Sequence, residues 1–161
     1  MEQKLKQIEN YLQSIRTYPT VGNRYKLCGH RPRSIVLGVQ RVCGGYRVGK
    51  YMKRLDTLTL WVVICEFMTT YFKDFKWNSV IINKNNQFGI HKDKNNKEGT
   101  QSMVIGLGEY EGGELNIYNE EQQILLSEDV RYRPFIYDLR NTYHSVSKFT
   151  GERYSMVFYT A

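Results

Sequence analysis

The sequence has few cysteines, few prolines and no long uncharged apolar run, and each shortage excludes a class of protein. Three cysteines with no CxxC pair argue against a disulfide framework or a cysteine-rich zinc site, and favour a reducing compartment. Three prolines and 13 glycines in 161 residues exclude collagen-like and low-complexity chains. The longest apolar run, 58–68, is too short to cross a bilayer, and the N-terminal segment has no apolar signal core. We therefore expect a soluble intracellular protein of the nucleus or cytoplasm, neither secreted nor membrane-bound.

Charge of one sign is in excess: 23 Lys and Arg stand against 16 Asp and Glu, for a formal net charge of +7. This balance suits a polyanionic partner, most often nucleic acid, although a merely soluble basic protein is the alternative. The basic residues concentrate in 22–54 with tyrosines between them, as in a surface that stacks bases, or else in a solvated basic face. This stretch contains Arg24, Lys26, Arg31, Arg33, Arg41, Arg47, Lys50, Lys53 and Arg54, with Tyr25, Tyr46 and Tyr51.

The segment 1–75 is predicted to be mainly helical, with one strand. Leu5, Ile8, Leu12 and Ile15 recur at helical spacing, and the run 35–39 reads as the strand. A second helix is predicted over 50–72. The stripe that this second helix is expected to bury consists of Leu55, Leu58, Val62, Cys65 and Met68.

After Trp77 the residue pattern changes to short β-rich runs separated by Gly, Asn and Asp clusters. This pattern is typical of a sandwich, barrel or jelly roll. The predicted fold class is therefore α+β. We expect a single domain over 1–161, in which helices of 1–75 support a β-rich core of 76–161. The expected strands are 80–82, 87–91, 103–107, 114–118, 135–139, 144–146 and 154–159.

Two of the three histidines are candidate metal ligands. His91 and Asp93 are two residues apart, so in a strand they point to the same side. His144 from a distant strand would complete a set of two histidines and one carboxylate, which holds one face of an octahedral Fe(II) ion and leaves three positions open. The bare His-x-Asp triplet is weak by itself, because a surface histidine beside an aspartate gives the same pattern.

Arg153 and Ser155 share a strand face by the same period of two. An arginine fork in a pocket lined by strands suits bidentate capture of a carboxylate, and a serine adds a hydroxyl donor. The alternative is a surface strand arginine. Between these residues and the histidines, Gly112 and Gly113 predict a tight hairpin.

Four motifs in this order resemble the Fe(II)/2-oxoglutarate-dependent dioxygenases: the HKD triplet at 91–93, the GGEL run at 112–115, His144, and the FTGERYS run at 149–155. The strings IVLGVQR, HKDKNN and FTGERYSMVFYT are similar to the Tet/JBP-like group of nucleic-acid base oxygenases, which includes viral, phage and transposon-associated members. The resemblance covers 34–161. Its GGEL run and the spacing from His144 to Arg153 also resemble prolyl hydroxylases and AlkB-like enzymes.

The resemblance implies a double-stranded β-helix, or jelly roll, with iron and its cosubstrate inside the mouth. It assigns His91, Asp93 and His144 as catalytic Fe(II) ligands. It assigns Arg153 to the distal carboxylate of 2-oxoglutarate, with Ser155 assisting. The implied reaction consumes O₂ and hydroxylates the 5-methyl group of thymine or 5-methylcytosine in DNA.

Three further residues receive roles from the resemblance. Asn96 occupies the place of an amide that contacts the target base, with Asn95 beside it, although both also suit a turn. Arg41 is a candidate for the cosubstrate or the DNA backbone, with a surface role as the alternative. The chain lacks the cysteine-rich region of animal Tet enzymes, so its basic loops would have to grip DNA.

Two other functions stay open. The first is a prolyl-hydroxylase-like or AlkB-like dioxygenase that acts on a protein, a small molecule or alkylated nucleic acid. The second is a binding module with an inactive jelly roll, which the presence of all three ligands and of Arg153 disfavours.

Overall fold

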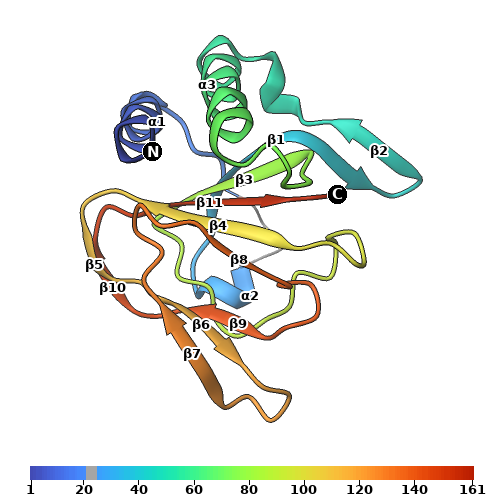
Figure 1. The fold of residues 1–161 in the computed structure, drawn as a ribbon, viewed down its shortest axis with the longest axis vertical. Helices are drawn as coiled ribbons and strands as arrows, with labels where there is room; N and C mark the ends of the chain where they lie inside the picture. The colour runs from blue at the N-terminus through green and yellow to red at the C-terminus, as the bar shows by residue number, and fades with distance from the viewer. Residues whose placement is uncertain (21–24) are drawn as a thin grey trace.

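The computed structural model describes residues 1–20 and 25–161 (Figure 1). Its helices are α1 Glu2–Ser14, α2 Tyr25–Cys28, the 3-10 helix η2 Lys50–Lys53, and α3 Leu55–Tyr71. Its strands are β1 Arg33–Val42, β2 Gly45–Val48, β3 Ser79–Lys84, β4 Ser102–Leu107, β5 Tyr110–Gly112, β6 Leu115–Tyr118, β7 Ile124–Glu128, β8 Phe135–Tyr137, β9 His144–Val146, β10 Phe149–Gly151 and β11 Tyr154–Tyr159.

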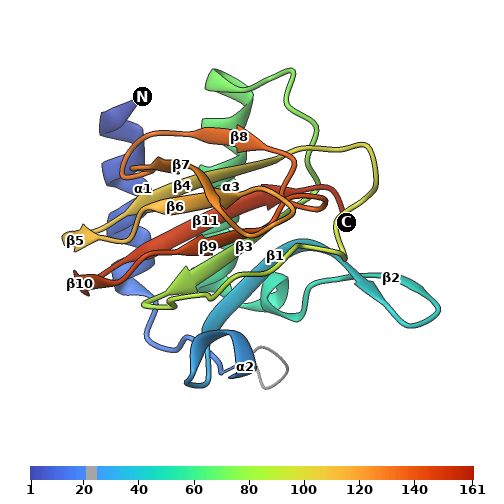
Figure 2. The same ribbon diagram turned by 90° about the horizontal axis from the view of Figure 1, so that it is seen from below.

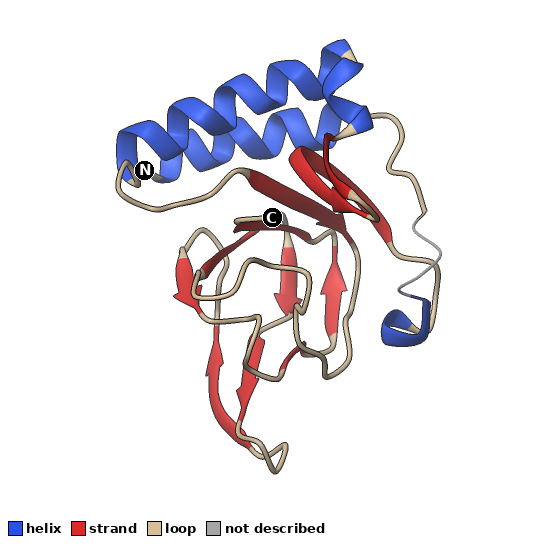
Figure 3. Cartoon of the chain, turned by 90° about the vertical axis from the view of Figure 1, so that its right-hand side faces the viewer, coloured by secondary structure: helices blue, strands red, loops and turns tan. Residues whose placement is uncertain are grey.

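These elements form three layers. A large antiparallel sheet has the strand order β2-β1-β3-β11-β4-β8, and a small antiparallel sheet has the order β7-β6-β9. Helices α1 and α3 lie on one face of the large sheet, and the small sheet lies across the other face (Figures 1 and 3). Figure 2 looks through the small sheet onto the large one. This arrangement confirms the α+β jelly roll with N-terminal helices packed against it.

The core lies between the helices and the large sheet, because alternate residues of β1, β3, β4 and β11 point toward α1 and α3. Ile35 on β1, Ile82 on β3 and Met156 on β11 are register partners, and all three are fully buried. Leu5, Ile8 and Leu12 cover them from α1 as part of the same cluster, as the spacing of these residues predicted. Burying each such side chain stabilises the fold by about 1.5–3 kcal/mol.

The segment 1–75 differs from the prediction in two ways. It contains two strands rather than one, because positive-φ glycines at 44 and 45 turn the chain back and pair β2 with β1. The second helix begins at Leu55 rather than at 50, because Arg54 has an extended backbone with φ −91° and ψ 136°. Residues 50–53 form the separate turn η2 before it.

The predicted buried stripe of α3 was wrong at three of its five positions, whereas Met68 is buried as predicted and Cys65 is half-buried. Leu55, Leu58 and Val62 are 81%, 41% and 51% exposed. Helix α3 instead buries a neighbouring stripe that includes Leu60 and Ile64. The helix is apolar on most of its circumference, so spacing alone does not identify the face that meets the sheet.

The β-rich segment also differs from the prediction in places. Residues 87–91 form no strand, and only His91 makes an isolated bridge there. Strands β5, β7 and β10 were not predicted. Two of them have only three residues, and β7 is mostly exposed, so none has a clear alternation of buried and exposed positions. Within the described ranges, no helix combines the length and hydropathy needed to cross a membrane.

Candidate metal centre

His91 and His144 are brought together by backbone pairing between two segments distant in sequence. The His91 amide donates to the His144 carbonyl at 3.0 Å, and the His144 amide donates to the His91 carbonyl at 2.9 Å. Residues paired in this way project their side chains to the same face. The two imidazole centroids therefore lie 4.3 Å apart at the edge of the small sheet.

Asp93 follows in a loop that the Leu139 backbone and the Arg140 side chain fix. Its amide donates to the Leu139 carbonyl at 2.9 Å. The Arg140 guanidinium donates to the carbonyls of Lys94 and, at 2.7 Å, of Asn96. Arg140 was not found from the sequence, because nothing in its local pattern shows that it reaches a loop more than 40 residues earlier.

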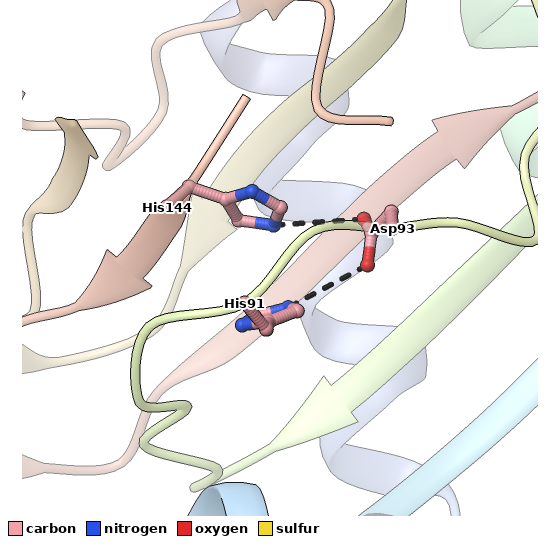
Figure 4. Close-up of side chains that lie close together, drawn as sticks. All are labelled: His91, Asp93 and His144. Carbon is pink, nitrogen blue, oxygen red and sulfur yellow. Dashed lines mark ion pairs between the residues drawn. The ribbon is translucent and has the colours of Figure 1, made fainter. Parts of the chain in front are cut away.

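The three side chains converge on one point (Figure 4). The Nε2 atom of His91 lies 3.5 Å from Asp93 Oδ1, and the Nε2 atom of His144 lies 3.6 Å from Asp93 Oδ2. One ligand atom from each of the three residues can be chosen so that all lie within 4.8 Å of one another. The structure thus assembles the predicted set of two histidines and one carboxylate.

Backbone carbonyls determine which nitrogen of each histidine faces the centre. Nδ1 of His91 lies 2.7 Å from the Gly89 carbonyl oxygen, and Nδ1 of His144 lies 2.9 Å from that of Thr142. A carbonyl oxygen only accepts, so each Nδ1 carries a hydrogen, and Nε2 is the nitrogen that each ring turns toward the centre. Two Nε2 atoms and a carboxylate then face one another, which is an arrangement that can hold a metal ion.

The electrostatics of Asp93 agree with this arrangement. Burial opposes ionisation of the carboxyl group, but hydrogen bonds with His144 and His91 outweigh burial and hold the pKa of Asp93 well below its usual range. The carboxylate is therefore ionised at neutral pH, as a metal ligand must be.

A cavity of about 510 Å³ between the two sheets contains this centre. Arg153 lines the same cavity and is only 2% exposed. Its Nη2 donates to the Gly113 carbonyl at 3.0 Å, while its Nε has no hydrogen-bond partner among the described residues. The rings of Tyr110 and Phe149 lie 5.3 and 5.6 Å from the guanidinium carbon, and burial lowers the pKa of Arg153 below its ordinary value.

Gly112 and Gly113 have the positive φ angles that the sequence predicted, but they do not form a hairpin between paired strands. They join β5, which pairs with β10, to β6, which pairs with β7 and β9. A Cβ atom on Gly113 would lie 2.8 Å from Arg153 Nε. Gly113 is therefore needed so that the arginine can lie against the backbone.

Ser155 also lines the cavity, as expected from its strand face, and accepts a hydrogen bond from Asn83 Nδ2 at 3.3 Å. Asn83 was missed by the sequence analysis. It stands in β3 as one polar residue after Val80, Ile81 and Ile82, and its partner is 72 residues away.

The remaining predicted site residues all line the cavity, with different exposure. Asn96 is buried, and its Nδ2 donates to Ser102 Oγ at 3.0 Å. Asn95 and Arg41 are exposed at the cavity. From the predicted basic stretch, Arg47, Lys50 and Tyr51 also reach the cavity, whereas Arg24 and the side chain of Tyr25 lie outside the described residues.

No protein-family profile matches the sequence, and no curated protein sequence matches it. Solved structures do match. An oxidoreductase of the 2OG-Fe(II) oxygenase family from Burkholderia pseudomallei is 17% identical with a TM-score of 0.63, over 96% of this chain and 77% of that one.

Two further solved structures share the fold. NgTET1 in complex with 5mC DNA is 13% identical with a TM-score of 0.60, over 99% of this chain and 68% of that one. A Pseudomonas putida prolyl-4-hydroxylase is 11% identical with a TM-score of 0.57, over 100% and 88%. At these identities the likeness shows that the chain has the jelly-roll fold of these proteins.

Proposed function

We propose that this chain is an Fe(II)- and 2-oxoglutarate-dependent oxygenase that acts on a nucleic-acid base. The observation that carries the proposal is a single cavity holding both a three-acceptor centre and a buried guanidinium. His91, Asp93 and His144 can hold a metal ion between them, and two imidazoles with one carboxylate are the donor set of non-haem Fe(II) oxygenases. Arg153 is an almost fully buried cation that lines the same cavity, and the distal carboxylate of 2-oxoglutarate would supply its counter-charge.

Bound iron and 2-oxoglutarate supply the oxidising chemistry: O₂ is consumed, 2-oxoglutarate becomes succinate and CO₂, and one oxygen atom enters a substrate C–H bond. The residues of the chain orient the metal ligands and exclude water from the cavity. The carbonyls of Gly89 and Thr142 keep the hydrogens of both imidazoles on Nδ1, so both Nε2 atoms stay free to bind metal. Val36, Ile81 and Val157 line the cavity between the sheets and limit the entry of water.

We further infer that the substrate carbon is the 5-methyl group of thymine or 5-methylcytosine in DNA. Arg41, Arg47 and Lys50 place three cations at the cavity, in a chain of net charge +7, which suits a phosphate backbone. Tyr51 beside them offers a ring on which a base can stack. The fold likeness to NgTET1, whose structure contains 5mC DNA, also favours this substrate. In a duplex the base must leave the stack to reach the cavity.

Asn95 is the first candidate for recognising the base. It is exposed at the cavity, and its side chain makes no hydrogen bond within the described residues, so both donor and acceptor are available to a base edge. Asn96 donates one amide hydrogen to Ser102, so its carbonyl oxygen and its second amide hydrogen remain for a substrate.

The test is anaerobic reconstitution with Fe(II) and 2-oxoglutarate, followed by O₂ and DNA that contains thymine or 5-methylcytosine. Digestion and nucleoside mass spectrometry then detect a base that has gained one oxygen atom. We expect this product with the wild type and not with His91→Ala, which lacks one proposed ligand.

Each other outcome contradicts a defined part of the proposal. Succinate without an oxidised nucleoside would keep the dioxygenase chemistry and overturn the base substrate, moving the search to proteins, small molecules or alkylated nucleic acid. Absence of both succinate and Fe(II) binding would overturn the enzyme assignment and favour an inactive binding module.

A further inference from the structure

A row of buried polar side chains crosses three strands of the large sheet on its cavity side. Ser34 on β1, Asn83 on β3 and Ser155 on β11 are register partners, and they are 3%, 4% and 5% exposed. All three line the cavity. Buried polar groups destabilise a fold unless they are hydrogen-bonded, so the orientation of each group in the row is constrained.

The orientation of the row is set from one end by Asn86, which is 1% exposed. Its Oδ1 accepts from the Arg33 backbone amide at 2.9 Å, and its Nδ2 donates to the Arg33 carbonyl at 2.9 Å. A backbone amide only donates and a backbone carbonyl only accepts, so this pair fixes which end of the Asn86 amide is nitrogen.

Asn86 then fixes Asn83. Asn86 Nδ2 lies 3.2 Å from Ser34 Oγ and 3.3 Å from Asn83 Oδ1, and Ser34 Oγ, acting as acceptor from Asn86, donates to that Asn83 oxygen at 2.8 Å. With its oxygen facing two donors, Asn83 must direct Nδ2 at Ser155 Oγ, 3.3 Å away. Ser155 therefore accepts at this contact, and its own hydroxyl hydrogen has no acceptor within residues 1–20 and 25–161.

We propose that Asn83 is a positioning residue that turns the hydroxyl hydrogen of Ser155 toward the cavity, so that Ser155 and Arg153 together donate to one carboxylate of 2-oxoglutarate. This inference rests on the proposed function. The chain Arg33–Asn86–Asn83–Ser155 acts as a relay of fixed polarity that begins at the backbone of β1 and ends at the cosubstrate.

The end of β3 holds the second donor in the same way. The Arg153 backbone amide donates to Asn85 Oδ1 at 2.7 Å, and the Asn85 amide donates to the Arg153 carbonyl at 2.8 Å. Residues 83–86 therefore fix both the backbone of Arg153 and the hydroxyl of Ser155. This explains three asparagines within four residues at the end of a buried strand.

A double-mutant cycle tests the proposal through binding rather than turnover. The dissociation constant of 2-oxoglutarate is measured by calorimetry, anaerobically with Fe(II), for the wild type, Asn83→Ala, Ser155→Ala and the double variant. We expect each single change to weaken binding by about 3- to 10-fold, the size of one hydrogen bond, and the double variant to be no weaker than Ser155→Ala. Steady-state kinetics should show this loss in KM for 2-oxoglutarate, with kcat little changed.

Asn83→Asp keeps the size of the side chain and reverses its polarity. An aspartate accepts the Ser155 hydrogen and adds a negative charge beside the incoming carboxylate, so binding should weaken more than with Asn83→Ala. If Asn83→Ala does not fold, Asn83→Leu, which is uncharged and close to asparagine in size, takes its place in the same cycle. Asn116 is the matched control: it is a buried asparagine that bonds to Ser127 on a neighbouring strand of the small sheet, and it does not line the cavity.

The outcomes separate this inference from the function on which it rests. Additive losses in the double variant would mean that Asn83 acts independently of Ser155, and would overturn the positioning role. Unchanged affinity in Asn83→Ala, or an equal loss in Asn116→Ala, would overturn it as well. Failure of the wild type itself to bind 2-oxoglutarate would instead remove the proposed function, and this inference with it.

Discussion

The two faces of the large sheet are made by the same strands and are buried for different purposes. Toward the helices, Ile35 and Ile82 are fully buried in apolar surroundings. One residue away on the same strands, Ser34 and Asn83 are almost as inaccessible and face the cavity. Because successive residues of a strand point to opposite faces, stability and chemistry are placed one position apart.

The two faces also differ in whether the chain itself supplies partners for their side chains. The helix side has its partners within the chain, since α1 and α3 cover it. The cavity side is left with acceptors that face one another at 91, 93 and 144 and with an unpartnered N–H on Arg153. We therefore expect changes on the helix side to lower stability and changes on the cavity side to lower ligand binding.

The largest effect is expected on the cavity side from Asp93→Asn, which keeps the shape and removes the charge. Fe(II) affinity and 2-oxoglutarate turnover should fall by more than about 100-fold, the upper end of what loss of a ligand's outer-shell partner costs. Asp74→Asn, the same change at an exposed residue, is the control. Retained Fe(II) binding in Asp93→Asn would show that the centre is not a metal site.

The next effect is expected on the helix side. Ile82→Ala should lower the free energy of unfolding by about 2–5 kcal/mol, because it leaves a cavity in the core. Affinity for 2-oxoglutarate should stay at the wild-type value while the variant is folded. Ile81→Ala is the matched control, since Ile81 is half-buried and lines the cavity. Urea unfolding should show a smaller loss there, and an equal loss at both positions would mean that the two faces do not differ in this way.

A smaller effect, again on binding, is expected from Arg153→Met. Loss of a charge-assisted hydrogen bond should weaken 2-oxoglutarate binding by about 10- to 150-fold, or about 1.5–3 kcal/mol. Stability should hold or rise, because a buried cation with an unpartnered N–H is removed. Arg131→Met is the control: Arg131 lies 5.6 Å from the Tyr110 ring that Arg153 also contacts, and does not line the cavity. Wild-type affinity in Arg153→Met would remove this residue from the cosubstrate site.

The sequence predicted the parts of the site that lie close together along the chain. His91 with Asp93, and Arg153 with Ser155, are pairs two residues apart, and both members of each pair line the cavity, although Asp93 lies in a loop rather than in the expected strand. The predicted α+β class followed from the change after residue 77 from helical spacing to short β-rich runs, and the jelly roll was implied by the resemblance. The meeting of His91 with His144 needed the resemblance, because their backbone pairing spans more than 50 residues.

The parts that the sequence did not predict depend on strand register. Asn83 joins the site only because β3 pairs with β1 and β11 in a register that aligns it with Ser34 and Ser155. Arg140 joins it by reaching the carbonyls of another loop. In both cases the contact depends on how distant segments pack, so the local pattern of polar and apolar residues does not predict it.

The smallest effect is expected from Leu58→Ala on α3, where the pattern of apolar residues misled the prediction. Leu58→Ala and Leu60→Ala are the same change two residues apart, one at a side chain that is 41% exposed and one at a fully buried side chain. Leu60→Ala should cost about 2–5 kcal/mol of unfolding free energy, whereas Leu58→Ala should stay within about 1 kcal/mol, because little area leaves contact and alanine favours helix. Urea unfolding of both variants measures the difference. A cost at Leu58 as large as that at Leu60, with a melting temperature that rises with protein concentration, would mean that another chain covers this face in solution.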